Sequence, residues 1–477
     1  MPEAAARTMN HAIRIFLTAV LCGLAGCAVQ RPPAMAVAET PPQWYAPLPH
    51  GGSGGGLTAW WQQLGDPVLA QLVAAAQTAS PTMSAARARI EEARASRTIT
   101  RAGLLPSADA TGSIRRGNTQ PPLPLATIAQ AGVQASWEID LFGANSDTAR
   151  AAQARLEGAQ AGWHQARIAV AAETATSYVA LRACEEQVKV AQGDAGSRAE
   201  TARLAQLSTR AGFTAPADAA LARASAADAA RRATQQRAQC DVAMKGLVAL
   251  TATPEARLRE LLASPWAQPS DSALPPVPSL PAALLVQRPD VYGAEREVAA
   301  ASADVGSTQA QRYPRLSLAG SIAAGAIRMG GVDTSLPTWS IGPLSLSLPL
   351  FDGGRRAANV EAARARYEDA VVQYTGQVRQ AVREVEEALV QLDSARARRA
   401  DAQAAFEGYA ASLRATEARY RSGLGSLLEL EESRRTALAA QTALISLQQE
   451  RLAAWVTLYR SVGGGWTAPG ALAAAGS

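Results

Sequence analysis

Apolar residues recur at helical spacing along two long stretches of the chain. Residues 144–211 and 355–422 are rich in alanine, and each can form one helix of about 68 residues, or about 100 Å at 1.5 Å per residue. The second stretch carries apolar residues alternately four and three apart, the spacing of a coiled-coil seam. The seam comprises Tyr367, Val371, Tyr374, Val378, Ala381, Val385, Ala388 and Leu392. The pattern predicts a cylinder of long helices, with a solvent-exposed bundle as the alternative.

Shorter segments alternate apolar and polar residues with the period of a β-strand. Residues 344–348 alternate leucine and serine, and residues 316–318 begin in the same way. The segments read as strands are roughly 107–117, 129–140, 316–327 and 339–350. One face is apolar and the other small and polar, as in a transmembrane barrel. Because about eight strands make the smallest closed barrel, strands must be pooled between chains, and three chains would supply twelve. Trp137 and Trp339 are candidates for anchors at the bilayer interface.

The two halves of the mature chain repeat one another at an offset of about 209 residues. The matching points are Leu105-Pro106 with Tyr313-Pro314, Leu141-Phe142-Gly143 with Leu350-Phe351-Asp352-Gly353, and Arg210-Ala211-Gly212 with Arg421-Ser422-Gly423. We therefore predict repeats at 60–263 and 282–466, a connector at 264–281 and a tail at 467–477. The shorter helices are expected at about 81–104, 216–252, 289–312 and 425–463, stacked in pairs along the long helices.

The N-terminus has the features of an export signal. Arg14 precedes an apolar run, residues 15–24, that is too short to span a bilayer. Residues 24–27, Leu-Ala-Gly-Cys, resemble a bacterial lipobox, which implies cleavage of a signal peptide at 1–26 and acylation of Cys27 with N-acyl and S-diacylglycerol groups. An ordinary signal with an incidental Cys27 is the alternative. Residues 27–59 are rich in proline and glycine and are expected to form a flexible, lipidated tether to the outer membrane.

Charge and histidine content exclude several classes of function. The chain carries 46 Lys and Arg against 41 Asp and Glu, a net charge of +5 without any basic block, which argues against a nucleic-acid partner. Only His11, His50 and His164 are present, and the first two lie in the signal and the linker. We therefore expect no catalytic triad, no metal site and no enzyme activity.

Two cysteines remain in the body of the mature chain. If the chain reverses near residue 213, Cys184 on one helix faces about residue 242 on the next, so Cys184 and Cys240 lie within one helical turn of each other. In an oxidising periplasm they are a candidate disulfide, and two free buried thiols are the alternative.

Several blocks of sequence resemble the outer membrane factor family of TolC-, OprM- and NodT-like exit ducts. They are Ser136-Trp137-Glu138-Ile139-Asp140-Leu141-Phe142-Gly143, Arg288-Pro289-Asp290-Val291 with Ala294-Glu295-Arg296, and Leu348-Pro349-Leu350-Phe351-Asp352-Gly353-Gly354-Arg355. The resemblance implies a mainly α trimer with a shared twelve-stranded β-barrel in the outer membrane and a long α-helical coiled-coil tunnel in the periplasm. It also implies a periplasmic adaptor and an inner-membrane pump, most often of the resistance–nodulation–division type, as partners in the efflux of drugs or other toxic compounds.

The helix interruptions supply candidate functional residues. Arg210, Gly212, Arg421 and Gly423 lie furthest from the strands, where the glycines can reverse the chain and the arginines can donate to an adaptor. Simple helix termination is the alternative. By resemblance, Leu428 and Glu432 match the apolar and acidic positions that ring a closed aperture, and a solvated acidic helix start is the alternative.

Two other functions stay open at this point. A type I outlet for secreted proteins would use the same architecture, although the lipobox and the Arg-Pro-Asp-Val block favour drug efflux. A structural lipoprotein built of coiled coils would not need paired alternating strands in both repeats.

Overall fold

The computed structural model describes residues 29–41, 44–47, 66–118, 125–266, 288–335 and 337–468 of the chain. The described residues fall into two compact units. Unit 1 contains residues 29–37, 89–160 and 293–375, and unit 2 contains the rest. The predicted signal peptide, Cys27, most of the linker, the connector and nearly all of the tail lie outside the described residues.

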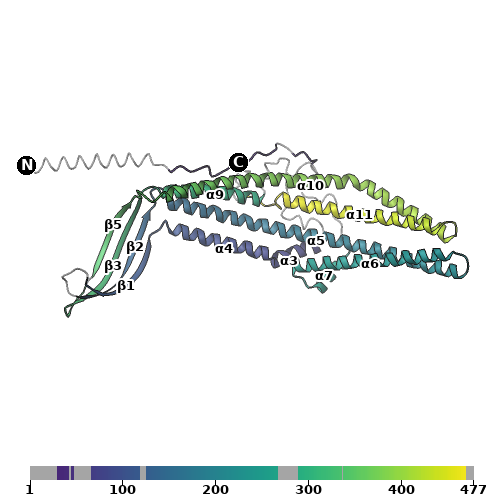
Figure 1. Cartoon of the computed structure of the whole chain (residues 1–477), viewed down its shortest axis with the longest axis horizontal. Coiled ribbons are helices and arrows are strands. Elements are labelled where there is room, and N and C mark those ends of the chain that lie inside the picture. Colours follow the sequence, from purple (N-terminus) through teal and green to yellow (C-terminus); the bar gives the residue numbers. More distant parts are fainter. Residues whose placement is uncertain are drawn as a thin grey trace, which may run out of the picture. The chain divides into compact units, whose positions relative to one another are not determined.

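The helices repeat in matched pairs along the chain (Figure 1). Their bounds are α3 Pro67–Ala79, α4 Pro81–Ala102, α5 Ala144–Arg210, α6 Pro216–Thr251, α7 Glu255–Leu262, α9 Pro289–Ala310, α10 Arg355–Arg421 and α11 Leu427–Ser461. Both long helices, α5 and α10, have 67 residues, α4 and α9 have 22 each, and α6 and α11 have 36 and 35. The equal lengths support an internal duplication. Among the described residues, no helix combines the length and the apolar composition needed to cross a membrane.

Unit 1 contains an antiparallel sheet of five strands (Figure 1). The strands are β1 Ser107–Gly117, β2 Ala126–Ile139, β3 Arg315–Met329, β4 Val332–Ser335 and β5 Thr338–Ser347. β2 pairs with β1 on one side and with β3 on the other, and β3 pairs with both β4 and β5. The sheet therefore joins the strand pairs of the two repeats, and β1 and β5 lie at its edges.

The register separates apolar and polar side chains onto opposite faces of this sheet. Residues directly opposite each other on neighbouring strands share a face. Trp137 pairs with Leu318, which pairs with Leu344, so these three lie on one face. Gln134 pairs with Asp109 on one side and with Ser321 on the other, and these lie on the second face. The predicted alternation thus holds across the sheet.

The return strand of the second repeat differs from the prediction. It was expected at 339–350, but the structure begins it earlier, with β4 at Val332–Ser335, and continues it as β5, which ends at Ser347. Gly330 and Gly331, with φ of 59° and 89°, turn the chain directly from β3 into β4, as a tight hairpin requires. A bulge opposite Leu318 and Gly320 takes up Pro343, which cannot donate a ladder hydrogen bond.

The N-terminal segment is packed where we expected a flexible tether, so that expectation is wrong for residues 29–41 and 44–47. In unit 1, Ser302 donates to the Pro32 carbonyl at 2.6 Å and Tyr367 donates to the Pro33 carbonyl at 3.0 Å. The Arg31 Nε lies 3.0 Å from Asp147, whose side chain is fully buried. A proline-rich segment does not form a hydrophobic core of its own, yet its carbonyls still accept hydrogen bonds. These contacts hold the segment against unit 1.

In unit 2 the same segment is held by a different carboxylate. The backbone N–H groups of Tyr45 and Ala46 donate to the two oxygens of Glu386 at 2.8 and 3.0 Å. Trp44 is buried in the main hydrophobic core. An apolar anchor and two charge-assisted hydrogen bonds therefore fix this part of the chain.

Acid is expected to stabilise unit 1 through Asp147. Burial raises the pKa of Asp147 from 3.8 to about 6, with Arg31 opposing the shift and Asp140 adding to it. Because the folded state holds this proton more tightly than the unfolded chain, the stabilisation is fully present below about pH 4 and is lost as pH rises through 6. We expect wild type to gain up to about 3 kcal/mol over Asp147→Asn between pH 7 and 4, because one pKa unit corresponds to about 1.4 kcal/mol. Melting of the detergent-solubilised proteins across this range measures the gain, and parallel pH profiles would contradict it.

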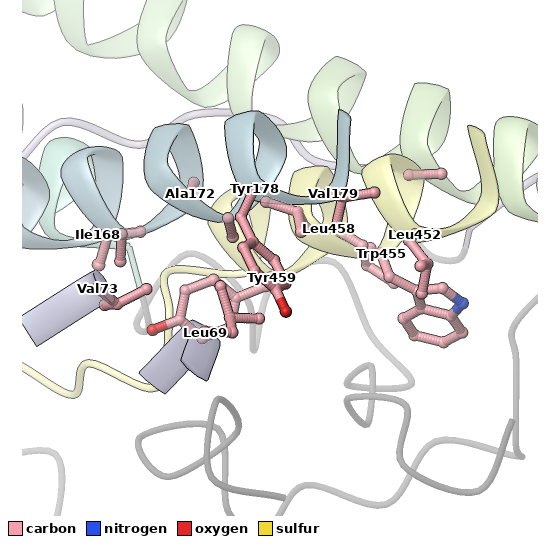
Figure 2. Packing of buried hydrophobic residues seen from close by; sticks show 14 of the residues in the cluster. Leu69, Val73, Ile168, Ala172, Tyr178, Val179, Leu452, Trp455, Leu458 and Tyr459 are labelled. Atoms are coloured by element: carbon pink, nitrogen blue, oxygen red, sulfur yellow. The ribbon is translucent and has the colours of Figure 1, made fainter. Parts of the chain in front are cut away.

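The main core of unit 2 gathers α3, α5 and α11 (Figure 2). Leu69 and Val73 of α3 lie beside Ile168 of α5, and Tyr178 lies beside Leu458 of α11. The start of α3 is fixed by Asp66, which accepts hydrogen bonds from the first turn of the helix and from the Tyr178 hydroxyl at 2.6 Å.

The Arg-Pro-Asp block forms a buried cluster of hydrogen-bonded polar side chains in unit 2. Arg288 is 3% exposed and donates to Asp290 at 3.0 and 2.5 Å, to Glu384 at 2.9 Å and to the Ser461 carbonyl at 2.8 Å. Gln377 also donates to Asp290 at 2.6 Å. One guanidinium therefore ties the start of α9 to the middle of α10 and the end of α11.

Candidate gate at the helix tips

Each long helix ends in the same kind of turn within unit 2. Gly212 ends α5 with φ of 81°, and the Phe213 N–H donates to the Ser208 carbonyl at 2.9 Å. Gly423 ends α10 with φ of 75°, and the Leu424 N–H donates to the Arg419 carbonyl at 2.8 Å. These are Schellman turns, in which glycine takes the left-handed conformation at low cost. The two glycines thus have the expected structural role at the tips.

Two of the exposed side chains at the tips are apolar and were not among our candidates. Phe213 is 86% exposed and Leu424 is 73% exposed, directly after the two glycines. Arg210 is exposed at the end of α5, and Arg421 lies 3.7 Å from Glu417 of its own helix. Phe213 and Leu424 could have been found in the sequence as the apolar residue that directly follows each Arg-x-Gly pattern. The tips therefore present an apolar residue beside an arginine in both repeats.

The four helices that form the tips pack together over a small apolar cluster. Ala202 and Ala205 of α5 contact Ala222 of α6, and Leu427 and Leu430 of α11 complete the cluster. A capping box holds the start of α11, because Ser426 and Glu429 each accept a hydrogen bond from the other's backbone N–H. The start of α11 is therefore fixed against the α5–α6 pair.

A buried charge network joins the α5–α6 pair to α11 beside this cluster. Its centre is Glu431, whose carboxylate is contacted by Arg198 of α5, by Ser225 of α6 at 2.6 Å and by Arg434 of its own helix at 3.3 Å. Arg198 also donates to Asp194 at 2.8 Å. Arg198 is 6% exposed and Arg434 is 5% exposed. Because the cations are buried, they need their acidic partners.

The second arginine extends the network to the neighbouring long helix. Arg434 donates to Ser197 of α5 at 2.8 Å and lies 3.5 Å from Glu417 of α10. A groove of about 870 Å³ runs beside these residues and is lined by α5, α10 and α11. The network thus contacts all four helices at this end of unit 2.

The predicted gate residues lie on an exposed face of α11, beside the face that carries the network. Leu428 is 71% exposed, and Glu432, four residues later, is also exposed. Glu432 accepts from Arg435 at 2.6 Å, and this hydrogen bond lowers the pKa of Glu432. The two side chains share a helix face. Glu431 and Arg434 connect α11 to α5, α6 and α10, and we did not identify them from the sequence.

The two cysteines form a disulfide between α5 and α6. Cys184 and Cys240 are bonded with a Cα–Cα distance of 5.7 Å, close to the facing position expected from the chain reversal. Cys240 is buried in the main core, and Gln236 donates to Gln187 beside the bond. In the part of the chain that the structure describes, no group of three His, Cys, Asp or Glu side chains is arranged to hold a metal ion.

Removing the disulfide is expected to destabilise unit 2. The bond closes a loop of 56 residues, and loop-closure entropy for that length corresponds to about 4 kcal/mol, of which native disulfides typically deliver 2–4. We expect Cys184→Ala/Cys240→Ala to melt several degrees below wild type. Wild type in reductant should match the variant, and the variant should not respond to reductant. Equal melting of wild type with and without reductant would show that the bond carries no stability.

Comparison with known proteins decides the identity of this fold. Residues 72–253 and 280–464 match the family model described as outer membrane efflux protein, one match to each repeat. The chain belongs to this family. Nodulation protein T of Rhizobium leguminosarum bv. viciae is 31% identical over 423 residues, covering 87% of this chain and 85% of that protein. Outer membrane protein OprJ of Pseudomonas aeruginosa is 32% identical over 393 residues, covering 79% and 80%.

The solved structures agree with this assignment. The outer-membrane channel OprN superposes with a TM-score of 0.80 at 29% identity, over 92% of this chain and 98% of that one. The predictions of family, TolC-like fold, efflux function and outer membrane location are confirmed. The chain is an outer membrane efflux channel, and members of its family are channels and not enzymes. Such channels work with a periplasmic adaptor and an inner-membrane pump.

Proposed function

We propose that three copies of this efflux protein form one exit duct that is closed at the helix tips until an adaptor engages them. The observation that carries this proposal is the sheet, which has one apolar face, one polar face and two edge strands, β1 and β5. Because β4 and β5 follow one another along the same side of β3, each chain fills four strand positions. Three such sheets joined at their edges supply twelve strands of one barrel, with the apolar face toward lipid and the polar face toward the lumen. The pump partner that fits best is of the resistance–nodulation–division type, on the resemblance of the Arg288-Pro289-Asp290-Val291 block.

The closed aperture in this proposal is a ring formed by α11. Leu428 is exposed in the single chain, and three copies of it around the axis would exclude water by packing. Glu432, kept ionised by Arg435, would add an acidic ring beside it. The network around Glu431 lies on the neighbouring face of α11 and holds the helix against α5 and α6.

The lipid anchor of the proposed duct is Cys27, which lies outside the described residues. Cys27 precedes Arg31 by four residues, which span at most about 14 Å when extended. Arg31 is held by Asp147 in the first turn of α5, directly after β2. A lipid on Cys27 would therefore enter the membrane beside the sheet.

The adaptor contact is tested by making the tips polar. We expect Phe213→Ser/Leu424→Ser to leave the trimer intact but to abolish efflux, because burying each side chain against an adaptor contributes at least about 1.5 kcal/mol. Together the changes should weaken adaptor binding about 100-fold. The measurements are dye efflux in the host lacking its own copy and crosslinking of the adaptor.

Val242→Ser is the matched control, because Val242 is 72% exposed on α6 away from the tips. Wild-type efflux in the tip variant would contradict the adaptor contact. A wild-type protein that forms no trimers would contradict the proposed duct itself.

A further inference from the structure

The outer face of the sheet carries a basic row at the end remote from the helices. Arg116 of β1 pairs with Thr127 of β2, and Thr127 pairs with Arg328 of β3. The three residues are direct neighbours across three strands and therefore share a face. Trp137 lies on the same face, because positions 127 and 137 of β2 are separated by an even number of residues.

The face between Trp137 and this basic row is apolar except for Ser335 of β4, which pairs with Ala326. Its apolar members are Ala108, Ala110, Gly112 and Ile114 of β1, Ala129, Ala131, Val133 and Ala135 of β2, Gly320, Ile322, Ala324 and Ala326 of β3, and Trp339, Ile341 and Leu344 of β5. The bulge in β5 keeps Ile341 and Leu344 on this face in spite of their odd spacing. Trp339 therefore lies inside the apolar band, whereas Trp137 lies at its edge.

The height of the apolar band matches a bilayer. Positions 127 and 137 are about 33 Å apart along the strand at 3.3 Å per residue. A tilt of about 40° reduces this to about 25 Å, which is the height of the apolar band on outer-membrane barrels. Trp137, whose indole N–H donates to the Leu104 carbonyl at 3.1 Å, marks the end next to the helices. The basic row marks the other end, where lipid headgroups of the outer leaflet begin.

Two guanidinium groups in this row are spaced for a ligand with two anionic groups. Arg116 and Arg328 are two strands apart, about 10 Å at the usual strand spacing. Arg328 is bridged to Asp333 at 2.7 Å through two hydrogen bonds, which fix its guanidinium along the rim. Asp333 takes the Nε donor and one Nη2 donor of Arg328 and offsets part of the positive charge of the row, so a phosphate would be bound through the remaining N–H groups of this guanidinium. Arginine is the side chain best suited to phosphate oxygens.

We propose that the row Arg116–Thr127–Arg328 binds the phosphate groups of lipopolysaccharide in the outer leaflet of the outer membrane. The disaccharide of lipid A carries a phosphate at each end, and its acyl chains would lie along the alanine-rich band below the row. The proposal rests on the trimeric duct, which turns the apolar face toward lipid. Three basic rows around the barrel would hold a ring of lipopolysaccharide at its rim.

The test uses the purified full-length trimer in detergent, with bound lipid counted by native mass spectrometry. The probes are diphosphoryl lipid A, its dephosphorylated form and phosphatidylglycerol. We expect Arg116→Ser/Arg328→Ser to bind diphosphoryl lipid A at least tenfold more weakly than wild type, because both guanidinium donors to the phosphate groups are removed. Dephosphorylated lipid A should bind wild type no better than it binds the variant.

The matched control is Arg115→Ser/Arg315→Ser, which removes two arginines from the opposite, polar face of the same strands. This control should bind lipid A like wild type. Wild-type affinity in the Arg116/Arg328 variant, an equal loss in the control, or equal binding of phosphatidylglycerol would overturn the proposal while leaving the duct intact. The same spectra report the trimer, so a wild-type protein without trimers would overturn the proposed function instead.

Discussion

Replacing Glu431 with alanine is expected to open the duct and raise its conductance several-fold. Glu431 is the acidic centre between Arg198 and Arg434, which are 6% and 5% exposed. Without it, Arg198 keeps Asp194 and Arg434 keeps only Glu417 at 3.5 Å, so two buried cations lie close together with one carboxylate fewer, and breaking a buried ion pair costs about 3–5 kcal/mol. Moving α11 away from α5 and α6 hydrates both arginines and removes this cost. A bias of 3 kcal/mol shifts an equilibrium between closed and open states about 100-fold.

The measurement is single-channel conductance of the purified protein in planar bilayers, with the uptake of a large polar antibiotic as a cellular readout. Glu450→Ala is the matched control, since Glu450 is on the same helix and pairs with Arg398 at 2.7 Å where both side chains are more than half exposed. Such a pair contributes at most about 1 kcal/mol, so the control should conduct like wild type. A folded Glu431→Ala trimer with wild-type conductance would show that the network does not hold the gate.

Replacing Arg288 with alanine is expected to lower the stability of unit 2 by about 3–5 kcal/mol. The change leaves Asp290 and Glu384 without their shared cation and leaves the Ser461 carbonyl without its donor. Because α9, α10 and α11 meet at this guanidinium, the loss should also reduce the amount of folded protein in the outer membrane. Thermal melting and quantification in purified membranes measure both effects.

The control for this change is an arginine whose ion pair is exposed. Arg257 pairs with Glu260 on α7 at 2.6 Å, and both side chains are more than half exposed. Arg257→Ala should therefore cost less than about 1 kcal/mol. Equal melting temperatures of the Arg288→Ala and Arg257→Ala variants would mean that the buried cluster around Arg288 does not stabilise the fold.

The long elements could be predicted because local patterns specify them. The bounds of α5, Ala144–Arg210, and of α10, Arg355–Arg421, differ from the predicted ranges by one residue at the end. Both helices end where glycine provides a Schellman turn, a signal that is readable in the sequence. The proximity of Cys184 and Cys240 followed from the same chain reversal, because antiparallel helices place residues at equal distances from the turn beside each other; the bond itself is seen only in the structure.

The features that we did not predict from the sequence depend on contacts between residues that are far apart in the chain. The segment at 29–47 reads as a proline-rich linker, and only Asp147, Ser302, Tyr367 and Glu386 reveal that it packs. Glu431 reads as one of several acidic residues at a helix start, and its burial depends on Arg198, which is 233 residues away. The bulge inside β5 depends on how that strand pairs with β3, which lies earlier in the chain.

Cryo-electron microscopy of the protein extracted from outer membranes tests whether three copies of the chain enclose a duct closed at the tips. We expect particles with three-fold symmetry in which twelve strands close one barrel and Leu428 from each copy meets at the axis, beside Glu432. Compact monomers, or trimers in which Leu428 and Glu432 lie away from the axis, would contradict this expectation.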